Sequence, residues 1–480
     1  MLTLTQRIEA GAARGHGLTF VVGGDHVTVP YAQLHEEAQA YAANLQALGI
    51  APGDHVALLG PTSRELVTAI QGIWLAGATI VVLPLPMRMA SIEEFVAATR
   101  RRIANADVKL VLVDPELAPF IEAQPDDPPM LGWDALSGPG RATASAWERP
   151  ADDPSRLAIL QFTSGSTSDP KGVMLPHHTV GANLDAICEA TSLDPDDDVL
   201  VSWLPLYHDM GLVGLLTLPM TTGTRLVLGA PTDFMAAPSR WMEWASTYGG
   251  TATAGPNFSY VLATRALKRA GERLDLSRMR IALNGAEPVD PATVSAFIEA
   301  GAPHGLRPGA VFPAFGMAEV AIAGTFPEPM SGLRTDPVDR RVLETERYAA
   351  PVEPDADGVR HLAVLGRPVP GLEIRVVDPA TGSVLRDREV GELEIRGTSV
   401  TPGYYKRPEA NADLFHDGWL RTGDLAYLVD GEMVMCGRIK DLIIVGGRNV
   451  YPEDVERALN DVDGVRAGNV IAFGIEERGK

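Results

Sequence analysis

The sequence predicts an α/β protein with a large N-terminal body of α/β sheets, a β-rich module and a small C-terminal α+β domain. Strand-like and helix-like segments alternate through the first half of the 480 residues, and a period of two follows after about Leu362. The length exceeds that of one ordinary domain, and 45% hydrophobic residues supply ample core. We therefore expect residues 1–436 to form the body with its β-rich module, and residues 437–480 to form a hinge and the start of the small domain.

The first predicted unit is a strand–helix–strand segment near the N-terminus. His55–Gly60 is apolar and strand-like, and Thr62 and Glu65 have the spacing of a capping box at the start of a helix. Gly77 ends that helix, and Thr79–Leu83 is a second strand. Two strands joined by a helix in this way predict a parallel sheet covered by helices.

The same alternation continues along the body. The further segments that we predict are strands at Val108–Val113 and Arg280–Asn284 and helices at Arg240–Ser246 and Pro291–Glu299. Residues 124–153 are rich in Pro, Asp and Ala, so we expect irregular surface there.

Beyond about Leu362, apolar and polar residues alternate, for example in residues 372–376. This period predicts strands that bury one face and expose the other, and we assign residues 362–436 to the β-rich module. After it, Leu442–Val445 and Val470–Phe473 are predicted strands. Pro452 stands at the favoured first position of a helix.

Charge and cysteine content exclude several classes of protein. The net charge of −21 disfavours nucleic acid and anionic membranes as partners. Cys188 and Cys436 lie far apart and match no disulfide or metal-ligand spacing. Arg7 and Glu9 interrupt any secretory signal, and no apolar run is long enough to span a bilayer. We expect a cytoplasmic protein without stable membrane insertion.

The most informative segment is the loop at residues 162–173, which lies between two apolar runs. Its small and hydroxyl-bearing residues are Thr163, Ser164, Gly165, Ser166 and Thr167, and Lys171 adds a positive charge. Glycine allows close approach to a phosphate, and hydroxyl groups donate hydrogen bonds to it. Because Lys171 precedes Gly172, the loop is not a Walker A motif. The loop alone fits either a nucleotide triphosphate site or an ordinary surface turn.

Further motifs follow in a fixed order: Trp203–Leu212, Gly255–Tyr260, Asn284–Pro288, Phe312–Glu319, Gly418–Leu425 and Gly437–Pro452. This set resembles the adenylate-forming superfamily of acyl-CoA synthetases, peptide-synthetase adenylation domains and luciferases. The residues within these motifs are most similar to those of fatty acyl-AMP ligases, and the resemblance extends over residues 18–480. The resemblance implies a ligase that uses ATP and Mg²⁺ to activate a fatty acid to an acyl-adenylate, with release of pyrophosphate.

The resemblance also assigns roles to the charged residues. Adenylation brings two anions together, so catalysis consists mainly of positioning and charge neutralisation. The loop with Lys171 would hold the β- and γ-phosphates. Glu319 would bind Mg²⁺, which prefers one or two carboxylates together with phosphate oxygens. The alternative for Glu319 is an ordinary solvated glutamate.

Adenine is expected between two turns at the carboxyl ends of strands, where open α/β sheets bind ligands. By resemblance, the residues of the two walls are Gly285, Ala286, Glu287 and Pro288 on one side and Ala314, Phe315, Gly316 and Met317 on the other. The Asp424 carboxylate would accept hydrogen bonds from both ribose hydroxyls, and Arg438 would donate hydrogen bonds to ribose or phosphate. The alternatives are tight turns packed on core and an Asp that caps its own backbone. Phe315 stands where relatives more commonly have Tyr, so a hydrogen bond from that ring would be missing.

His208 has two interpretations. A lone histidine is more often structural, whereas the resemblance implies contact with an ATP phosphate or gating of an acyl tunnel. The residues that would line an acyl pocket are Trp203, Met210, Gly211, Gly255, Asn257 and Tyr260. Composition does not distinguish such a lining from plain core.

Lys440 lies in the segment that, by resemblance, is the hinge for rotation of the small domain between adenylation and thioester formation. The relatives carry a late lysine that reaches the α-phosphate and the carboxylate. Lys480 does not match the setting of that lysine. We therefore expect that the small domain is truncated in this sequence.

The acyl acceptor is expected to be the phosphopantetheine thiol of an acyl carrier protein, in lipid, polyketide or lipopeptide biosynthesis. Residues 330–364 are long enough to contain the extra segment of fatty acyl-AMP ligases, although their composition predicts a loop with one helical turn. One alternative is a fatty acyl-CoA synthetase that uses coenzyme A. Another is a protein that binds acyl-adenylate without turnover because it lacks the late lysine.

Overall fold

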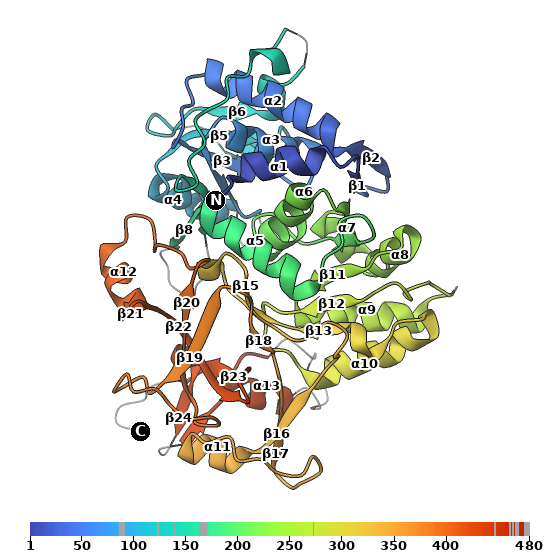
Figure 1. Cartoon of the computed structure of the whole chain (residues 1–480), viewed down its shortest axis with the longest axis vertical. Coiled ribbons are helices and arrows are strands. Elements are labelled where there is room, and N and C mark those ends of the chain that lie inside the picture. The colour runs from blue at the N-terminus through green and yellow to red at the C-terminus, as the bar shows by residue number, and fades with distance from the viewer. Residues whose placement is uncertain are drawn as a thin grey trace.

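The computed structural model describes the chain except for residues 86–91, 122–123, 139, 163–169, 272, 446–447, 460–461, 463–464, 466–469 and 475–480. Two large sheets with their helices form the body, and an antiparallel sheet follows toward the C-terminus (Figure 1). The predicted α/β fold class is confirmed.

The first sheet of the body has six strands, in the order β6 (Met130–Gly132), β5 (Val108–Val113), β3 (His55–Leu59), β4 (Thr79–Val82), β7 (Leu157–Phe162) and β8 (Gly172–Pro176). Strands β3, β4 and β5 are parallel, as the strand–helix–strand pattern predicts, while β7 and β8 form an antiparallel pair. The associated helices are α3 (Arg64–Leu75) and α4 (Ile92–Asn105).

The start of α3 differs from the prediction of a capping box at Thr62. The Ser63 hydroxyl accepts the N–H of Leu66, so the helix begins at Arg64. Thr62 itself is buried. The spacing of Thr62 and Glu65 was therefore misleading, because the serine between them has the extended backbone that a cap requires.

The second sheet has seven strands, in the order β13 (Val311–Pro313), β12 (Ile281–Asn284), β11 (Ala252–Gly255), β9 (Val199–Ser202), β10 (Arg225–Leu228), β1 (Gly17–Phe20) and β2 (Val27–Pro30). All neighbours pair in parallel except β1 and β2. The remaining helices of the body are α1 (Leu4–Ala12), α2 (Tyr31–Ala47), α5 (His177–Thr191), α6 (Leu218–Thr222), α7 (Pro231–Ala236), α8 (Ser239–Tyr248), α9 (Asn257–Arg269) and α10 (Pro291–Gly301). Of these, α2 packs mainly on α3, and α5 contacts β7 and β8 of the first sheet. One buried apolar cluster includes residues of both sheets and joins them into one body.

The predicted β-rich module is an antiparallel sheet. Its strands are β19 (Leu372–Val377), β20 (Gly391–Gly397), β22 (Trp419–Val429), β21 (Phe415–His416) and β23 (Glu432–Arg438), and α12 (Pro408–Leu414) precedes β21. A smaller sheet of β14 (Phe315–Gly316), β15 (Ala323–Phe326) and β18 (Arg367–Pro368) lies before it in the chain. The predicted domain boundary at residues 436/437 falls within β23.

Two local predictions were wrong. Residues 330–364 hold the strand pair β16 (Thr335–Asp339) and β17 (Val359–Ala363) with α11 (Arg340–Glu346) between them, where composition predicted a loop with one helical turn and no strands. The polar strand β16 forms because β17 supplies a partner from later in the chain. The predicted strand at Val470–Phe473 is irregular, and the side chains of Ile471 and Phe473 are exposed.

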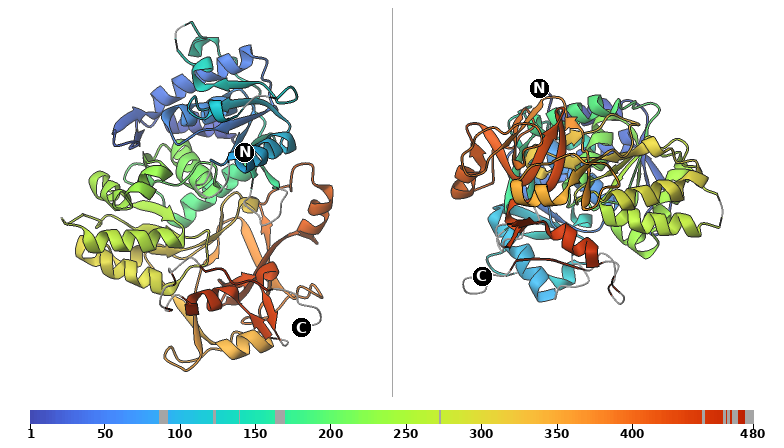
Figure 2. Two further views of the ribbon diagram at one scale, coloured as in Figure 1. Left: turned by 180° about the vertical axis from the view of Figure 1, so that it is seen from behind. Right: turned by 90° about the horizontal axis from the view of Figure 1, so that it is seen from below.

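The C-terminal segment packs on the β16–α11–β17 unit. It comprises β24 (Ile443–Val445), β25 (Arg448–Val450) and α13 (Pro452–Leu459), and it lies at the same end of the molecule as the β-rich sheet (Figure 2). The Arg360 guanidinium pairs with Asp454 at 3.1 Å and lies 4.4 Å from the ring centroid of Tyr451. The Asn449 amide donates to the Glu344 carbonyl at 3.1 Å. No helix among the described residues is long and apolar enough to cross a membrane.

Candidate active site

The predicted phosphate loop joins β7 to β8. Thr163, Ser164, Gly165, Ser166 and Thr167 lie outside the described residues. Lys171 stands directly before β8, and Gly172 pairs with Phe162 at the end of β7. The Gln161 amide donates to the Tyr207 carbonyl at 2.8 Å, which fixes the end of β7 beside the segment that carries His208.

The two predicted adenine walls lie side by side because β12 and β13 are neighbours. Asn284 pairs with Pro313, and the Ala314 N–H donates to the Asn284 carbonyl at 2.9 Å. A Cβ at Gly285 would lie 3.1 Å from the Ala314 carbonyl oxygen, so this position favours glycine. Ala286 has a φ of 67°, a left-handed conformation that is strained for alanine and frequent near binding sites.

One polar atom at this turn has no partner among the described residues. The amide oxygen of Asn284 is buried and accepts no hydrogen bond from them, while its amide nitrogen donates to Asn257 at 3.2 Å. A buried acceptor without a donor is costly, and an amino group of a bound base would satisfy it. The residues present therefore fit adenine.

Glu287 and Pro288 stand on the exposed side of the first wall. The Glu287 carboxylate accepts the N–H of Phe258 at 3.2 Å, at the start of α9. Burial of the carboxyl raises the pKa of Glu287, although the backbone hydrogen bonds from α9 oppose this shift. The carboxylate thus caps α9, a role that the sequence analysis did not assign.

The second wall belongs to β14 and the residues around it. Phe315 is buried, while Gly316 and Met317 are half-buried. A Cβ at Gly316 would lie only 2.0 Å from the Ile322 carbonyl oxygen, so no other residue fits there without a backbone shift. This close pairing with the strand that follows places the next turn, which carries Glu319.

Glu319 lies on a short 3₁₀ turn, Ala318–Val320, and only 8% of its surface is exposed. The Tyr404 hydroxyl donates to Glu319 Oε1 at 2.8 Å. Burial raises the pKa of Glu319, the hydrogen bond from Tyr404 opposes this, and the nearby Asp209 carboxylate raises it further. Glu319 is therefore a buried carboxylate beside a second acidic group, not a solvated surface residue.

Asp424 and Arg438 face each other on β22 and β23. They occupy paired positions in the ladder, and Arg438 Nε lies 3.1 Å from Asp424 Oδ1. Burial raises the pKa of Asp424 to about 6, against the attraction of Arg438 and with a further contribution from Glu319. The structure thus brings Asp424, Arg438 and Glu319 into one electrostatic neighbourhood.

His208 interacts with the next residue in the chain. Its Nδ1 lies 2.6 Å from Asp209 Oδ1, and the Met210 N–H donates to the same carboxylate at 2.8 Å. Burial lowers the pKa of His208, but the Asp209 carboxylate outweighs this and leaves the pKa raised. Asp209 therefore favours a protonated His208, which suits contact with a phosphate.

The donor set fits a hard divalent cation. Glu319 and Asp209 are buried carboxylates that raise the free energy of each other's ionised forms, and a cation would relieve this repulsion. Mg²⁺ takes oxygen ligands of this kind and completes its shell with phosphate and water.

Two of the predicted acyl-pocket residues, Trp203 and Tyr260, belong to an aromatic cluster that we call the Trp203 cluster, which consists of Trp203, Phe234, Trp241, Phe258 and Tyr260. Trp203 stacks on Phe234 with centroids 3.9 Å apart, and Trp241 and Phe258 lie edge-on to Trp203. Tyr260 is 1% exposed and donates to the Leu283 carbonyl at 2.7 Å. Phe234 and Trp241 were missed by the sequence analysis, because they come from α7 and α8, outside every motif.

The remaining predicted acyl-pocket residues lie around this cluster. Met210 and Gly211 begin a π-helix, Met210–Thr217, and a Cβ at Gly211 would lie 2.3 Å from the Pro205 carbonyl oxygen. Gly255 ends β11, where a Cβ would meet the Ser259 hydroxyl oxygen at 2.4 Å. Asn257 opens α9 and contacts Asn284, so it joins the aromatic region to the adenine turn.

The predicted hinge residue Lys440 lies on a 3₁₀ turn, Ile439–Asp441, directly after β23. Its side chain is exposed, and its charge lowers the pKa of Asp424. Lys440 is thus close enough to the candidate site to act on it electrostatically.

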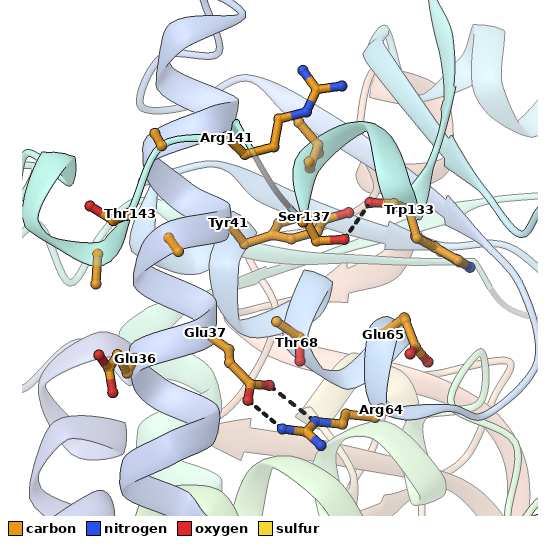
Figure 3. A pocket seen from close by; sticks show the side chains of 15 residues that line it. Glu36, Glu37, Tyr41, Arg64, Glu65, Thr68, Trp133, Ser137, Arg141 and Thr143 are labelled. Carbon is orange, nitrogen blue, oxygen red and sulfur yellow. Dashed lines mark hydrogen bonds and ion pairs between the residues drawn. The ribbon is translucent and has the colours of Figure 1, made fainter.

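A separate cavity of about 600 Å³ lies in the N-terminal part of the body (Figure 3). Helices α2 and α3 and residues 133–138 and 141–144 line it, and the Glu37–Arg64 ion pair crosses its lower part. None of its lining residues belongs to the nucleotide motifs. The nucleotide motifs lie instead at the neighbouring turns after β12 and β13 and around Glu319, Asp424 and Arg438, so we place the candidate active site there and not in this cavity.

The fold and the site together define the class of protein. The chain belongs to the family of AMP-binding enzymes, which matches residues 8–405. Rv1013 of Mycobacterium tuberculosis is 39% identical over 95% of this chain and 84% of its own length. The long-chain-fatty-acid–AMP ligase FadD26 of Mycobacterium marinum is 34% identical over 94% of this chain and 79% of its own length.

Solved structures agree with this family. A structure from studies of fatty acyl-adenylate ligases from E. coli and L. pneumophila matches with a TM-score of 0.89 and 33% identity, over 96% of this chain and 84% of that chain. The fatty acyl-adenylate ligase of L. pneumophila in complex with acyl adenylate and pyrophosphate matches with a TM-score of 0.85 and 31% identity, over 99% and 84% of the two chains. The family and ligase class predicted from the motifs are confirmed.

Proposed function

We propose that this protein is a fatty acyl-AMP ligase that uses ATP and Mg²⁺ to convert a fatty acid to an acyl-adenylate. The observation that carries the proposal is that Glu319, Asp424 and Arg438 share one electrostatic neighbourhood, while the Asn284 carbonyl at the end of β12 holds Ala314, five residues before Glu319. The likeness to FadD26 and to the L. pneumophila ligase supports fatty acids as the substrate class.

In the proposed first step, a fatty carboxylate oxygen attacks the α-phosphorus of ATP, and pyrophosphate leaves. Asp424 holds the ribose hydroxyls, and the Asn284 turn holds adenine. His208 and Lys171 would contact the phosphates, and the positive charge of Lys171 lowers the barrier for joining two anions. Glu319, with Asp209 nearby, would hold Mg²⁺, which neutralises phosphate charge when bound.

In the proposed second step, the phosphopantetheine thiol of an acyl carrier protein attacks the acyl carbonyl carbon, and AMP leaves. JamA of Moorena producens, a medium-chain-fatty-acid–[acyl-carrier-protein] ligase, is 32% identical over 94% of this chain and supports this acceptor. The predicted division into residues 1–436 and 437–480, with Lys440 as the hinge, belongs to this proposal. Because the reaction consumes ATP, we expect it in the cytoplasm.

Two assays test the proposal. Pyrophosphate exchange into ATP, measured with fatty acids of 6 to 18 carbons, is expected to depend on the acid and on Mg²⁺. No exchange with any acid would contradict the adenylation step. Thioester formation is then compared between a holo carrier protein and free coenzyme A. Equal turnover with coenzyme A would favour the alternative, a fatty acyl-CoA synthetase.

A further inference from the structure

One buried tyrosine contacts both charged groups that the proposed reaction needs. The Tyr404 hydroxyl donates to Glu319 Oε1 at 2.8 Å. The ammonium of Lys171 lies 4.9 Å from the centroid of the same ring. Tyr404 follows Glu319 by 85 residues and belongs to none of the motifs that the sequence analysis identified. It therefore joins the residue after the phosphate loop to the buried carboxylate.

The backbone beside Tyr404 is fixed to β8, the strand that follows Lys171. The Tyr405 N–H donates to the Gly172 carbonyl at 2.8 Å, and the Met174 N–H donates to the Gly403 carbonyl at 3.0 Å. Tyr404 itself forms an antiparallel bridge with Val173. Residues 403–405 thus add a short antiparallel segment to the end of the strand that carries the loop.

Two further residues, Asn411 and Thr401, hold this segment in place. The Asn411 side chain accepts the N–H of Tyr404 at 2.7 Å and donates to its carbonyl at 2.9 Å. The Thr401 N–H donates to the Glu319 carbonyl at 2.8 Å, and the Thr401 hydroxyl donates to the Met174 carbonyl at 2.6 Å. The segment is therefore hydrogen-bonded to both the Lys171 strand and the Glu319 turn.

The two contacts of Tyr404 have different physical effects. A hydroxyl donor on Oε1 fixes the rotation of the Glu319 carboxyl and leaves the other oxygen for a cation. The ring face attracts the Lys171 ammonium through its quadrupole, without consuming an N–H donor that a phosphate needs. One side chain thereby sets the positions of an anion and a cation at once.

We propose that Tyr404 is a positioning residue that couples metal binding at Glu319 to phosphate binding at Lys171. This inference rests on the proposed function, in which Glu319 holds Mg²⁺ beside the phosphates of ATP. Tyr404 does not touch the reacting atoms. Its hydroxyl, through Glu319, determines how much Mg²⁺ increases the affinity for ATP. Its ring, through Lys171, contributes to the affinity for ATP in the absence of Mg²⁺.

The test compares three variants of the full chain. Tyr404→Phe removes the hydroxyl and keeps the ring, while Tyr404→Leu removes both. Tyr405→Phe is the matched control, because its hydroxyl also donates to a carboxylate at 2.8 Å, that of the half-exposed Asp107. ATP binding is measured by calorimetry with Mg²⁺ and with a chelator, and Mn²⁺ bound with ATP is measured by electron paramagnetic resonance.

For Tyr404→Phe we expect about tenfold weaker binding of Mg·ATP and of Mn²⁺, with unchanged binding of metal-free ATP, because one hydrogen bond to a charged group is lost. Tyr404→Leu should also weaken metal-free ATP, and Tyr405→Phe should match the unmodified chain. In the Glu319→Gln background, Tyr404→Phe should have no further effect on metal dependence.

Equal Mg²⁺ dependence in Tyr404→Phe and Tyr405→Phe would overturn the positioning role, as would an equal loss of both ATP forms. If the unmodified chain binds ATP without any effect of Mg²⁺ and shows no pyrophosphate exchange, the proposed function fails instead. Thermal unfolding of each variant shows that the folded state is retained, and the double variant gives the coupling even if one single variant loses stability.

Discussion

The candidate nucleotide site and the Trp203 cluster are both buried, but different forces hold them. In the first, Glu319, Asp424 and Asn284 are polar groups whose partners come from distant parts of the chain. In the second, ring contacts such as that of Trp203 with Phe234 fill space. A polar site is sensitive to the loss of one atom or charge, whereas an aromatic cluster is sensitive to the loss of volume. Isosteric substitutions should therefore impair the nucleotide site more than the Trp203 cluster, and truncating substitutions should destabilise the Trp203 cluster more.

The largest expected effect on activity is that of Glu319→Gln. We expect pyrophosphate exchange to fall roughly 1000-fold, because a charged metal ligand supplies about 4 kcal/mol of charge stabilisation. Thermal stability should stay the same or rise, since a buried amide costs less than a buried carboxylate. Glu346→Gln, an exposed position on α11, is the control. Exchange within tenfold of the unmodified chain would contradict the role of Glu319.

The largest expected effect on stability is that of Trp203→Ala. Truncation of a buried aromatic residue should lower the free energy of unfolding by about 3–5 kcal/mol. Trp203→Phe keeps most of the volume and should cost less. Chemical denaturation measures both, and metal-free ATP binding to the folded variants should be unchanged. If Trp203→Ala weakened ATP binding without loss of stability, the separation of the two regions would be wrong.

The next effect is a pH dependence that arises from Asp424. Because its pKa is raised to about 6, the carboxylate is protonated below that pH and cannot accept both ribose hydroxyls. The value of kcat/KM for ATP should fall as the pH decreases through about 6. Asp424→Asn should abolish this decrease of kcat/KM at low pH. It should also raise the KM for ATP about 100-fold, because two hydrogen bonds to a charged acceptor are lost.

Stability should change in the opposite direction over the same pH range. The folded pKa of Asp424 lies above its unfolded value, so this residue stabilises the fold at low pH and loses that contribution as the pH rises through about 6. Without ligand, the thermal stability of Asp424→Asn should lack the decrease that Asp424 causes as the pH rises through about 6. A stability profile identical to that of the unmodified chain would contradict the raised pKa.

The smallest effect is expected for Phe258→Leu. This side chain lies edge-on to Trp203, with centroids 6.2 Å apart, and 41% of it is exposed. Loss of one aromatic pair should cost about 1 kcal/mol or less. If the Trp203 cluster lines the acyl pocket, the preferred fatty acid should change in length while the KM for ATP stays constant. A changed KM for ATP with an unchanged acid preference would place Phe258 in the nucleotide region.

Much of this arrangement could be predicted from local patterns. The strand–helix–strand spacing from His55 to Leu83 predicts the parallel sheet, and the alternation from Leu372 onward predicts the antiparallel one. The two neighbouring turns that we propose for adenine could be predicted because they follow strands that pair with each other. The cap at Ser63, the pairing of β16 with β17 and the irregular segment at Val470–Phe473 could not be predicted, because each depends on backbone conformation or on the presence of a pairing partner.

The sequence by itself determined the family and the two kinds of sheet, and it predicted Glu319 and Asp424 as site residues, because these depend on residue type and spacing. Only the tertiary structure decided that Tyr404 bonds Glu319, that Asp209 pairs with His208 and that Phe234 stacks on Trp203. Contacts between distant segments follow from strand pairing and helix packing, which residue spacing does not encode. Burial, which shifts the pKa values of Asp424 and Glu319, likewise depends on the whole fold.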